Sequence, residues 1–176
     1  MTPTALPSNP TADTAADEGR YLALQARDAR FDGHFFTGVT STSIYCRPVC
    51  AVRTPRRENC RFFVLAAQAE SAGFRPCLRC RPELAPQAMA WSVQDASGIL
   101  ARLAERLGVS DRHLRRIFEA ALGVSPLQYL QTRRLLTAKQ LLTDTAMPVT
   151  QVALASGFAS VRRFNAAFVG QYGLNP

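Results

Sequence analysis

The chain has 176 residues, 47% hydrophobic and 19% charged, which excludes wholesale disorder and fits one domain or two small ones. Its formal net charge is +8, and all but one of its 21 basic residues are arginine. Arginine suits phosphate oxygens and guanine edges, so we expect an anionic polymer as partner, with an ordinary solvated surface as the alternative. No apolar run reaches the roughly 20 residues that span a bilayer, and no secretion signal opens the chain, so we expect no membrane contact and a cytoplasmic, nucleoid-associated location.

The N-terminal half predicts a tail followed by a small α+β module. Residues 1–19 are rich in Pro, Thr, Ala and Asp and carry a net charge of −3, which predicts a flexible tail. Within residues 20–82, the runs 35–40, 44–45 and 61–64 predict short strands, and an Ala-rich stretch before Gly73 predicts a short helix. A module of this size has a small apolar core and often needs a metal or disulfides to stay folded.

The C-terminal half predicts helices throughout. Two prolines at 82 and 86 discourage a continuous helix, so we expect a linker over residues 83–97 and a helical domain over residues 98–176. This domain contains an internal repeat, because the segment from Gly108 and Ser110 recurs at Gly157 and Ser160, an offset of 49 to 50 residues. Each copy reads as a short helix, a glycine turn, a capping serine and a second helix, which is a helix-turn-helix.

The second helix of each copy should carry apolar anchors and DNA-contacting side chains. We expect four anchors in the core: Leu114, Phe118, Phe164 and Phe168. Arginine and asparagine read base edges and also bind phosphates, so we expect DNA contacts from Arg112, Arg115, Arg116, Arg162, Arg163 and Asn165.

Four of the five cysteines have metal-ligand spacing. Cys46 and Cys50 form a CxxxC pair, Cys77 and Cys80 form a CxxC pair, and two such pairs close one tetrahedral Zn²⁺ site. All-thiolate sites are usually structural, but the many arginines around these cysteines favour a reactive, phosphate-attracting site, and spacing leaves both readings open. Cys60 is expected to be a small core residue, and neither histidine has ligand spacing.

Ordered motifs around these cysteines carry a family resemblance. The strings DGHFF (32–36), STSIYCRPVC (41–50), RREN (56–59) and AGFRPCLRCRP (72–82) resemble the zinc-binding N-terminal domain of the Ada alkylation-response family. Residues 98–176 resemble the AraC-type double helix-turn-helix module that follows this domain in that family, and we expect it to be shortened at both ends. The resemblance implies an α+β zinc-stapled domain followed by an all-α DNA-binding domain.

The resemblance also implies an activity and its residues. Members of the family are single-turnover methyltransferases that move a methyl group from a DNA methylphosphotriester to a zinc-bound cysteine, at the position of Cys46 here, and thereby become transcriptional activators. The same comparison implies one Zn²⁺ on the four cysteines and a phosphate path formed by Thr42, Arg53, Arg75 and Arg79. Methylation turns a thiolate into a neutral thioether, which should strengthen attraction to DNA.

The expected partners are double-stranded DNA and, during activation, RNA polymerase, with the protein acting as a monomer. Two alternatives stay open. The motifs at residues 56–60 and 81–86 resemble those of modules fused ahead of an alkylated-base DNA glycosylase. The chain is therefore a candidate for the regulatory part of such a protein. Alternatively, it is a DNA-binding regulator whose zinc only stabilises the fold.

Overall fold

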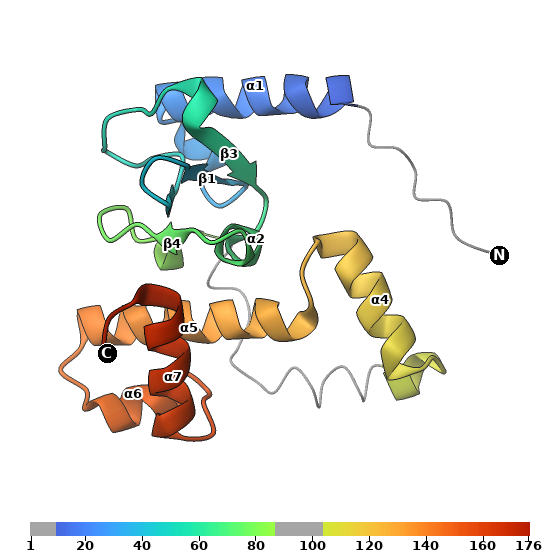
Figure 1. The fold of residues 1–176 in the computed structure, drawn as a ribbon, viewed down its shortest axis with the longest axis vertical. Coiled ribbons are helices and arrows are strands. Elements are labelled where there is room, and N and C mark those ends of the chain that lie inside the picture. The colour runs from blue at the N-terminus through green and yellow to red at the C-terminus, as the bar shows by residue number, and fades with distance from the viewer. Residues whose placement is uncertain (1–9, 87–103) are drawn as a thin grey trace.

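The computed structural model describes residues 10–86 and 104–176. Its N-terminal half is a small α+β domain and its C-terminal half is a set of helices lying beneath it (Figure 1). The first half contains α1 (Pro10–Ala26), η1 (Ala29–Phe31), β1 (Phe36–Val39), β2 (Ile44–Cys46), η2 (Arg57–Asn59), β3 (Cys60–Phe63), α2 (Ala66–Ser71), β4 (Arg75–Pro76) and η3 (Pro82–Leu84). The second contains α4 (Asp111–Leu122), α5 (Pro126–Asp144), α6 (Val149–Ala155) and α7 (Val161–Tyr172). Within these residues, no helix is both long enough and apolar enough to cross a bilayer.

The sheet has the strand order β3-β1-β2-β4. Strand β1 pairs antiparallel with β3 and β2, whereas the short β4 pairs parallel with β2. Gly38 lies in β1 opposite Tyr45, where a Cβ atom would come within 2.9 Å of the rings of Phe63 and Phe74. Only glycine therefore lets these two rings pack over the centre of the strand.

The tail expected over residues 1–19 is corrected for residues 10–19, which form the first part of α1; residues 1–9 lie outside the described residues. The helix is held at its C-terminal half, where Ala23 and Leu24 are buried and the Tyr21 hydroxyl donates to the carbonyl of Pro55 at 3.1 Å. The N-terminal half is rich in alanine and acidic residues, which favour a helix start once the other half is docked. This first part of the helix was not predicted because its residues have no spaced apolar pattern.

The helical half confirms the internal repeat. Helices α4 and α7 each have 12 residues, each begins after a serine whose side chain caps the helix (Ser110 and Ser160), and each ends at a glycine in the left-handed conformation. Helix α5 connects the two copies, and its first turn is closed by a capping box between Ser125 and Gln128. The expected helices after Pro126 and Pro148 are both present.

The two copies differ in burial. Phe164 and Phe168 are buried in a core with Leu135 and Val152, as expected. The corresponding Leu114 and Phe118 are only half-buried, and no residue of α4 is buried, so the expectation that all four anchors lie in the core is wrong for α4. Residues 98–103, the start of this copy, lie outside the described residues.

The linker expected over residues 83–97 is corrected at its start. Pro82 to Leu84 form the 3-10 helix η3, and Glu83 and Ala85 are buried, with Ala85 in the core of the N-terminal domain. The prolines prevent an α-helix here but do not prevent packing, because proline suits the first turn of a short helix. Residues 87–97 lie outside the described residues.

Candidate metal centre and nucleic-acid interface

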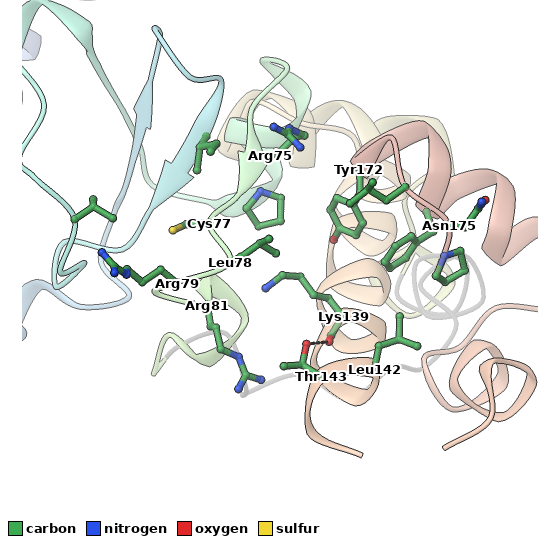
Figure 2. A pocket seen from close by; sticks show the side chains of 16 residues that line it. Arg75, Cys77, Leu78, Arg79, Arg81, Lys139, Leu142, Thr143, Tyr172 and Asn175 are labelled. Atoms are coloured by element: carbon green, nitrogen blue, oxygen red, sulfur yellow. Dashed lines mark hydrogen bonds between the residues drawn. The ribbon is translucent and has the colours of Figure 1, made fainter. Parts of the chain in front are cut away.

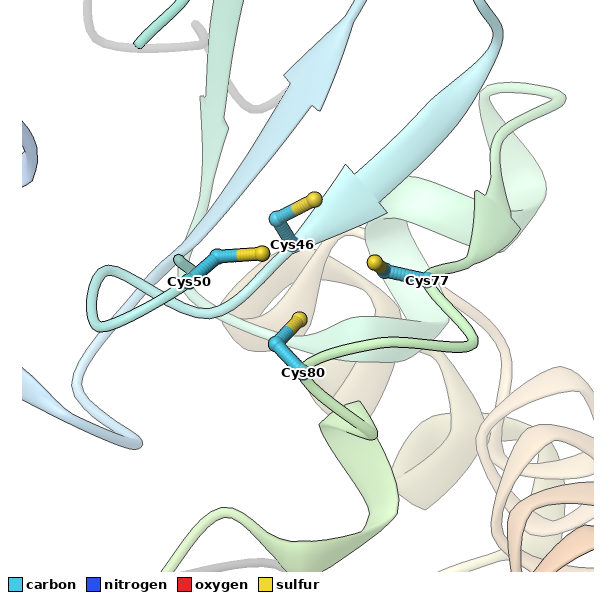
Figure 3. Close-up of side chains that lie close together, drawn as sticks. All are labelled: Cys46, Cys50, Cys77 and Cys80. Carbon is cyan, nitrogen blue, oxygen red and sulfur yellow. The ribbon is translucent and has the colours of Figure 1, made fainter. Parts of the chain in front are cut away.

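Pairing of two short strands brings the four ligand cysteines together. Cys46 is the last residue of β2, and Cys50 follows after a turn closed by the Cys50 N–H to the Arg47 carbonyl at 3.1 Å. Cys77 follows β4, and its N–H donates to the Tyr45 carbonyl at 2.9 Å, which continues the pairing of β4 with β2. The four sulfur atoms consequently converge and lie within 4.8 Å of one another (Figure 3).

This arrangement fits Zn²⁺. A tetrahedron of thiolates at the usual Zn–S distance has sulfur atoms about 3.8 Å apart, which is compatible with the observed cluster. Cys46, Cys50 and Cys77 are buried and Cys80 is half-buried. Cys60 is separate and buried, and its thiol donates to the Arg56 carbonyl at 3.3 Å, which confirms it as a core residue.

The electrostatics of the sulfurs also favour a cation. Hydrogen bonds to Cys77 and Cys80, together with burial, raise the pKa of the Cys46 thiol. Hydrogen bonds from Cys46 and Cys80 lower the pKa of the Cys77 thiol. Four neighbouring sulfurs cannot all ionise by themselves, whereas a divalent cation compensates their repulsion and keeps them deprotonated.

Arg47 follows Cys46, and its side chain forms structural contacts beside the cysteine cluster. Its guanidinium forms a two-pronged ion pair with Asp32 and donates to the Cys80 carbonyl at 3.1 Å. Its backbone N–H points at the Cys80 sulfur at 3.3 Å, a contact that stabilises negative charge on that sulfur. Arg47 therefore joins both cysteine pairs and is not free to bind a phosphate.

The four expected phosphate-binding residues are all exposed around this centre. Thr42 lies in the β1–β2 turn, where its hydroxyl lies 3.4 Å from the Val39 carbonyl, and Arg53 lies in the loop after Cys50. Arg75 and Arg79 flank Cys77 on the edge of a hollow of about 800 Å³ between the cysteine-bearing segment and α5 and α7 (Figure 2). Within the described residues, no ion pair is formed by Arg53, Arg75 or Arg79. Arg47, Arg57 and Arg81, in contrast, each have an acidic partner. Their role in phosphate binding stays a prediction.

The six expected DNA-contacting residues are also exposed, three on α4 and three on α7. On α4, Arg115 pairs with Asp111 at 2.8 Å and Arg116 contacts His113 Nδ1 at 3.0 Å. On α7, Arg162, Arg163 and Asn165 are exposed, whereas the anchors Phe164 and Phe168 are buried. The two helices thus present basic faces, and DNA contact by these residues stays a prediction.

The comparisons with known proteins identify both halves. A model of the metal binding domain of Ada matches residues 19–83, and a helix-turn-helix domain model matches residues 103–176. The bifunctional transcriptional activator/DNA repair enzyme AdaA of Bacillus subtilis is 31% identical over 176 residues, which cover 94% of this chain and 82% of the relative. The chain belongs to the Ada family. The expected fold, a small sheet-containing domain and an AraC-type helical domain, is confirmed, and so is the expected cofactor, one Zn²⁺ held by cysteines.

Other members of the Ada family are longer. The probable bifunctional transcriptional activator/DNA repair enzyme AlkA of Mycobacterium tuberculosis is 41% identical over 160 residues, which cover 82% of this chain and 32% of the relative. The bifunctional transcriptional activator/DNA repair enzyme Ada of Escherichia coli is 34% identical over 157 residues, which cover 84% of this chain and 44% of the relative. The chain therefore spans less than half the length of these two relatives.

A group of buried polar residues between the two halves was missed by sequence reasoning. Its members are Tyr45, Glu70, Glu83, Thr132 and Lys139, all less than a tenth exposed. Glu83 lay in the expected linker, and Glu70 is one acidic residue in an Ala-rich stretch, so neither gave a signal. The one available signal was that Lys139 is the single lysine among 21 basic residues.

Proposed function

We propose that this Ada-family chain is a single-turnover methyltransferase that takes a methyl group from a DNA methylphosphotriester onto Cys46 and then activates transcription. The observation that carries the proposal is the convergence of four cysteine sulfurs within 4.8 Å, flanked by exposed arginines without ion-pair partners in the described chain. A purely structural zinc site would not require exposed, unpaired arginines around it.

The transfer is a displacement at carbon. The Cys46 Sγ attacks the methyl carbon, the S–C bond forms as the C–O bond breaks, and the phosphodiester leaves with the bonding electron pair. Bound Zn²⁺ supplies a thiolate near neutral pH, so no general base is required. Arg53, Arg75 and Arg79 would align the phosphate and stabilise the departing anion. The thioether product is stable, so each chain acts once.

Peptide mass spectrometry tests this proposal directly. Zinc-loaded protein incubated with duplex DNA that carries backbone methylphosphotriesters should gain one methyl group, located on Cys46. Cys60→Ser is the matched control, because Cys60 is a buried cysteine outside the cluster, and it should be methylated as the wild type is. Cys46→Ser should gain none.

Two other results would overturn the assignment. A methyl group on Cys50, or on Cys80, the most exposed of the four ligands, would move the acceptor to a different cysteine. No methyl group on any cysteine, in protein shown to hold one zinc ion, would leave a DNA-binding regulator with a structural metal.

The helical half would supply sequence recognition in this proposal. Arg112, Arg115 and Arg116 on α4 and Arg162, Arg163 and Asn165 on α7 would contact the duplex, with α4 and α7 as recognition helices. The protein would act as a monomer and engage RNA polymerase at its promoter. Transcription from a methylation-responsive promoter in a purified system, with and without prior methylation of the protein, measures this part.

A further inference from the structure

Helix α5 contacts the segment that follows the second cysteine pair through a buried ion pair. Glu83 lies three residues after Cys80, in η3, and its carboxylate receives Lys139 Nζ at 2.6 and 2.7 Å. The Glu83 and Lys139 side chains are 1% and 9% exposed. Arg81 makes a further bond from the same segment, to Asp144 at the end of α5, at 2.7 Å.

The first cysteine pair is tied to the same helix through Glu70. Tyr45 directly precedes Cys46, and its hydroxyl donates to Glu70 Oε1 at 3.0 Å. The Thr132 hydroxyl of α5 donates to Glu70 Oε2 at 2.7 Å. Thr132 and Lys139 are seven residues apart, so they lie two turns apart on one face of α5.

These contacts connect metal binding to domain docking. The segments that end in Tyr45 and begin after Cys80 fix where the ligand sulfurs stand, and α5 holds both segments. Loss of the ligand geometry would break the buried ion pair of Glu83 with Lys139 and separate Glu70 from its hydroxyl donors. Buried charged and polar groups without partners are strongly unfavourable. Because such coupling is reciprocal, whatever stabilises the docking of α5 also stabilises the metal centre.

We infer that Lys139 is a positioning residue for the metal centre, so that zinc binding and docking of the helix-turn-helix domain stabilise each other through Lys139–Glu83 and Thr132–Glu70. Lys139 belongs to the other half of the chain and is not a ligand. The inference does not depend on methyl transfer, because its measurements report metal retention and domain docking alone.

Amine labelling provides the first test, because Lys139 carries the only lysine ammonium in the protein. In the zinc-loaded protein, an amine-reactive acetylating reagent should modify Lys139 slowly, since the ammonium is buried against Glu83. After removal of zinc with a chelator, the rate of modification measured by peptide mass spectrometry should rise by about tenfold or more, within the usual range of coupling between sites. Equal rates in the two states would overturn the inference.

Zinc release provides the second test. Lys139→Met should release zinc to a chromogenic chelator about tenfold faster than the wild type, whereas Lys139→Arg, which keeps the charge, should release it more slowly than Lys139→Met. Gln140→Met is the matched control, because Gln140 is half-buried next to Lys139 on α5 and the substitution introduces the same methionine side chain. Release from Lys139→Met at the wild-type rate would overturn the inference.

A second pair of variants covers the case in which Lys139→Met does not fold. Thr132→Val keeps the shape of the side chain and removes the bond to Glu70, so it should also hasten zinc release. Thr137→Val is its control, because Thr137 is on the same helix and has no side-chain hydrogen bond within the described parts of the chain. Equal release from the two threonine variants would count against the inference as well.

Discussion

Glu70 shows how burial changes one side chain. It is 8% exposed between α2, β2 and α5, and burial raises its pKa to about 7, against the hydrogen bonds from Thr132 and Tyr45, which act in the opposite direction. Glu70 also acts on Tyr172: burial raises the pKa of the Tyr172 hydroxyl most, and the charges of Glu70 and Glu83 raise it further. A raised carboxyl pKa means that the fold binds this proton more tightly than the unfolded chain does.

The contribution of Glu70 to stability is therefore full below its ordinary pKa of 4.5 and is lost as the pH rises through about 7. Glu70→Gln is neutral throughout, so the wild type should lose about 2 kcal/mol relative to this variant between about pH 5 and pH 8. Urea unfolding of the two zinc-loaded proteins across this range measures the difference, in which effects of pH on the metal site cancel. Glu58→Gln, at a 71% exposed side chain, should show no such trend. A constant difference between wild type and Glu70→Gln would contradict the prediction.

Single residues were predictable from the sequence where chemistry fixes their spacing. The CxxxC and CxxC pairs identified the four sulfurs that converge. A serine after the glycine turn, just before each second helix, identified both helix caps. Glu70 and Lys139 were not predictable, because their partners are 62 and 56 residues away in the chain. Nothing local distinguishes a carboxylate that will be buried from one that will be solvated.

At the scale of elements, α1 is the helix that was not predicted, because the composition of its first half is typical of a flexible tail. It lies across the sheet (Figure 1), and Arg57 links it to the domain by stacking over Tyr21 and Phe62 and pairing with Glu18. Leu24 of α1 also lines a small hollow beside Cys46 and Cys50. The helix is thus a wall of the metal-binding domain. Strands β1 to β3 and the later helices were predictable because each has its own apolar pattern. The two-residue strand β4 (Arg75–Pro76) was not predicted because it has none, and α1 has one only in its second half.

Two leucines on α1 test whether this helix contributes to stability. Leu24 is 5% exposed and Leu22 is 58% exposed, so Leu24→Ala should lower the free energy of unfolding by about 2–4 kcal/mol and Leu22→Ala by less than about 0.5 kcal/mol. Denaturant unfolding followed by circular dichroism compares the two variants. Similar small losses for both would mean that α1 does not dock in solution.

At the scale of the whole molecule, the distribution of charge was predictable from the sequence, but the docking of the two halves was not. The basic composition and the repeat predicted two basic helix faces, which α4 and α7 present. How the two halves meet was not predictable, because contacts such as Gln68 Nε2 to the Leu122 carbonyl at 2.9 Å depend on surfaces that exist only after each half has folded. Docking places the cysteine cluster beside α5 in one basic molecule.

Methylation of one thiolate should therefore change DNA binding by the whole protein. Four thiolates around Zn²⁺ carry two net negative charges and the methylated site carries one, so repulsion of the DNA backbone decreases. We expect methylated protein to bind duplex DNA about tenfold more tightly than unmodified protein, with a smaller ratio at high salt. Titration at two salt concentrations measures the ratio, with protein exposed to unmethylated DNA as the control. Equal affinities at both salt concentrations would contradict the charge mechanism.

The unequal burial of α4 and α7 implies that the two copies of the repeat open at different rates. Helix α7 buries Phe164, Phe168 and Tyr172, whereas α4 buries no residue. Backbone amides in α4 should therefore exchange with deuterium through frequent local opening, and those in α7 only through rarer, larger unfolding events. One helix would meet its target already rigid, while its counterpart would lose conformational entropy on contact, so the two half-sites would contribute unequally to affinity.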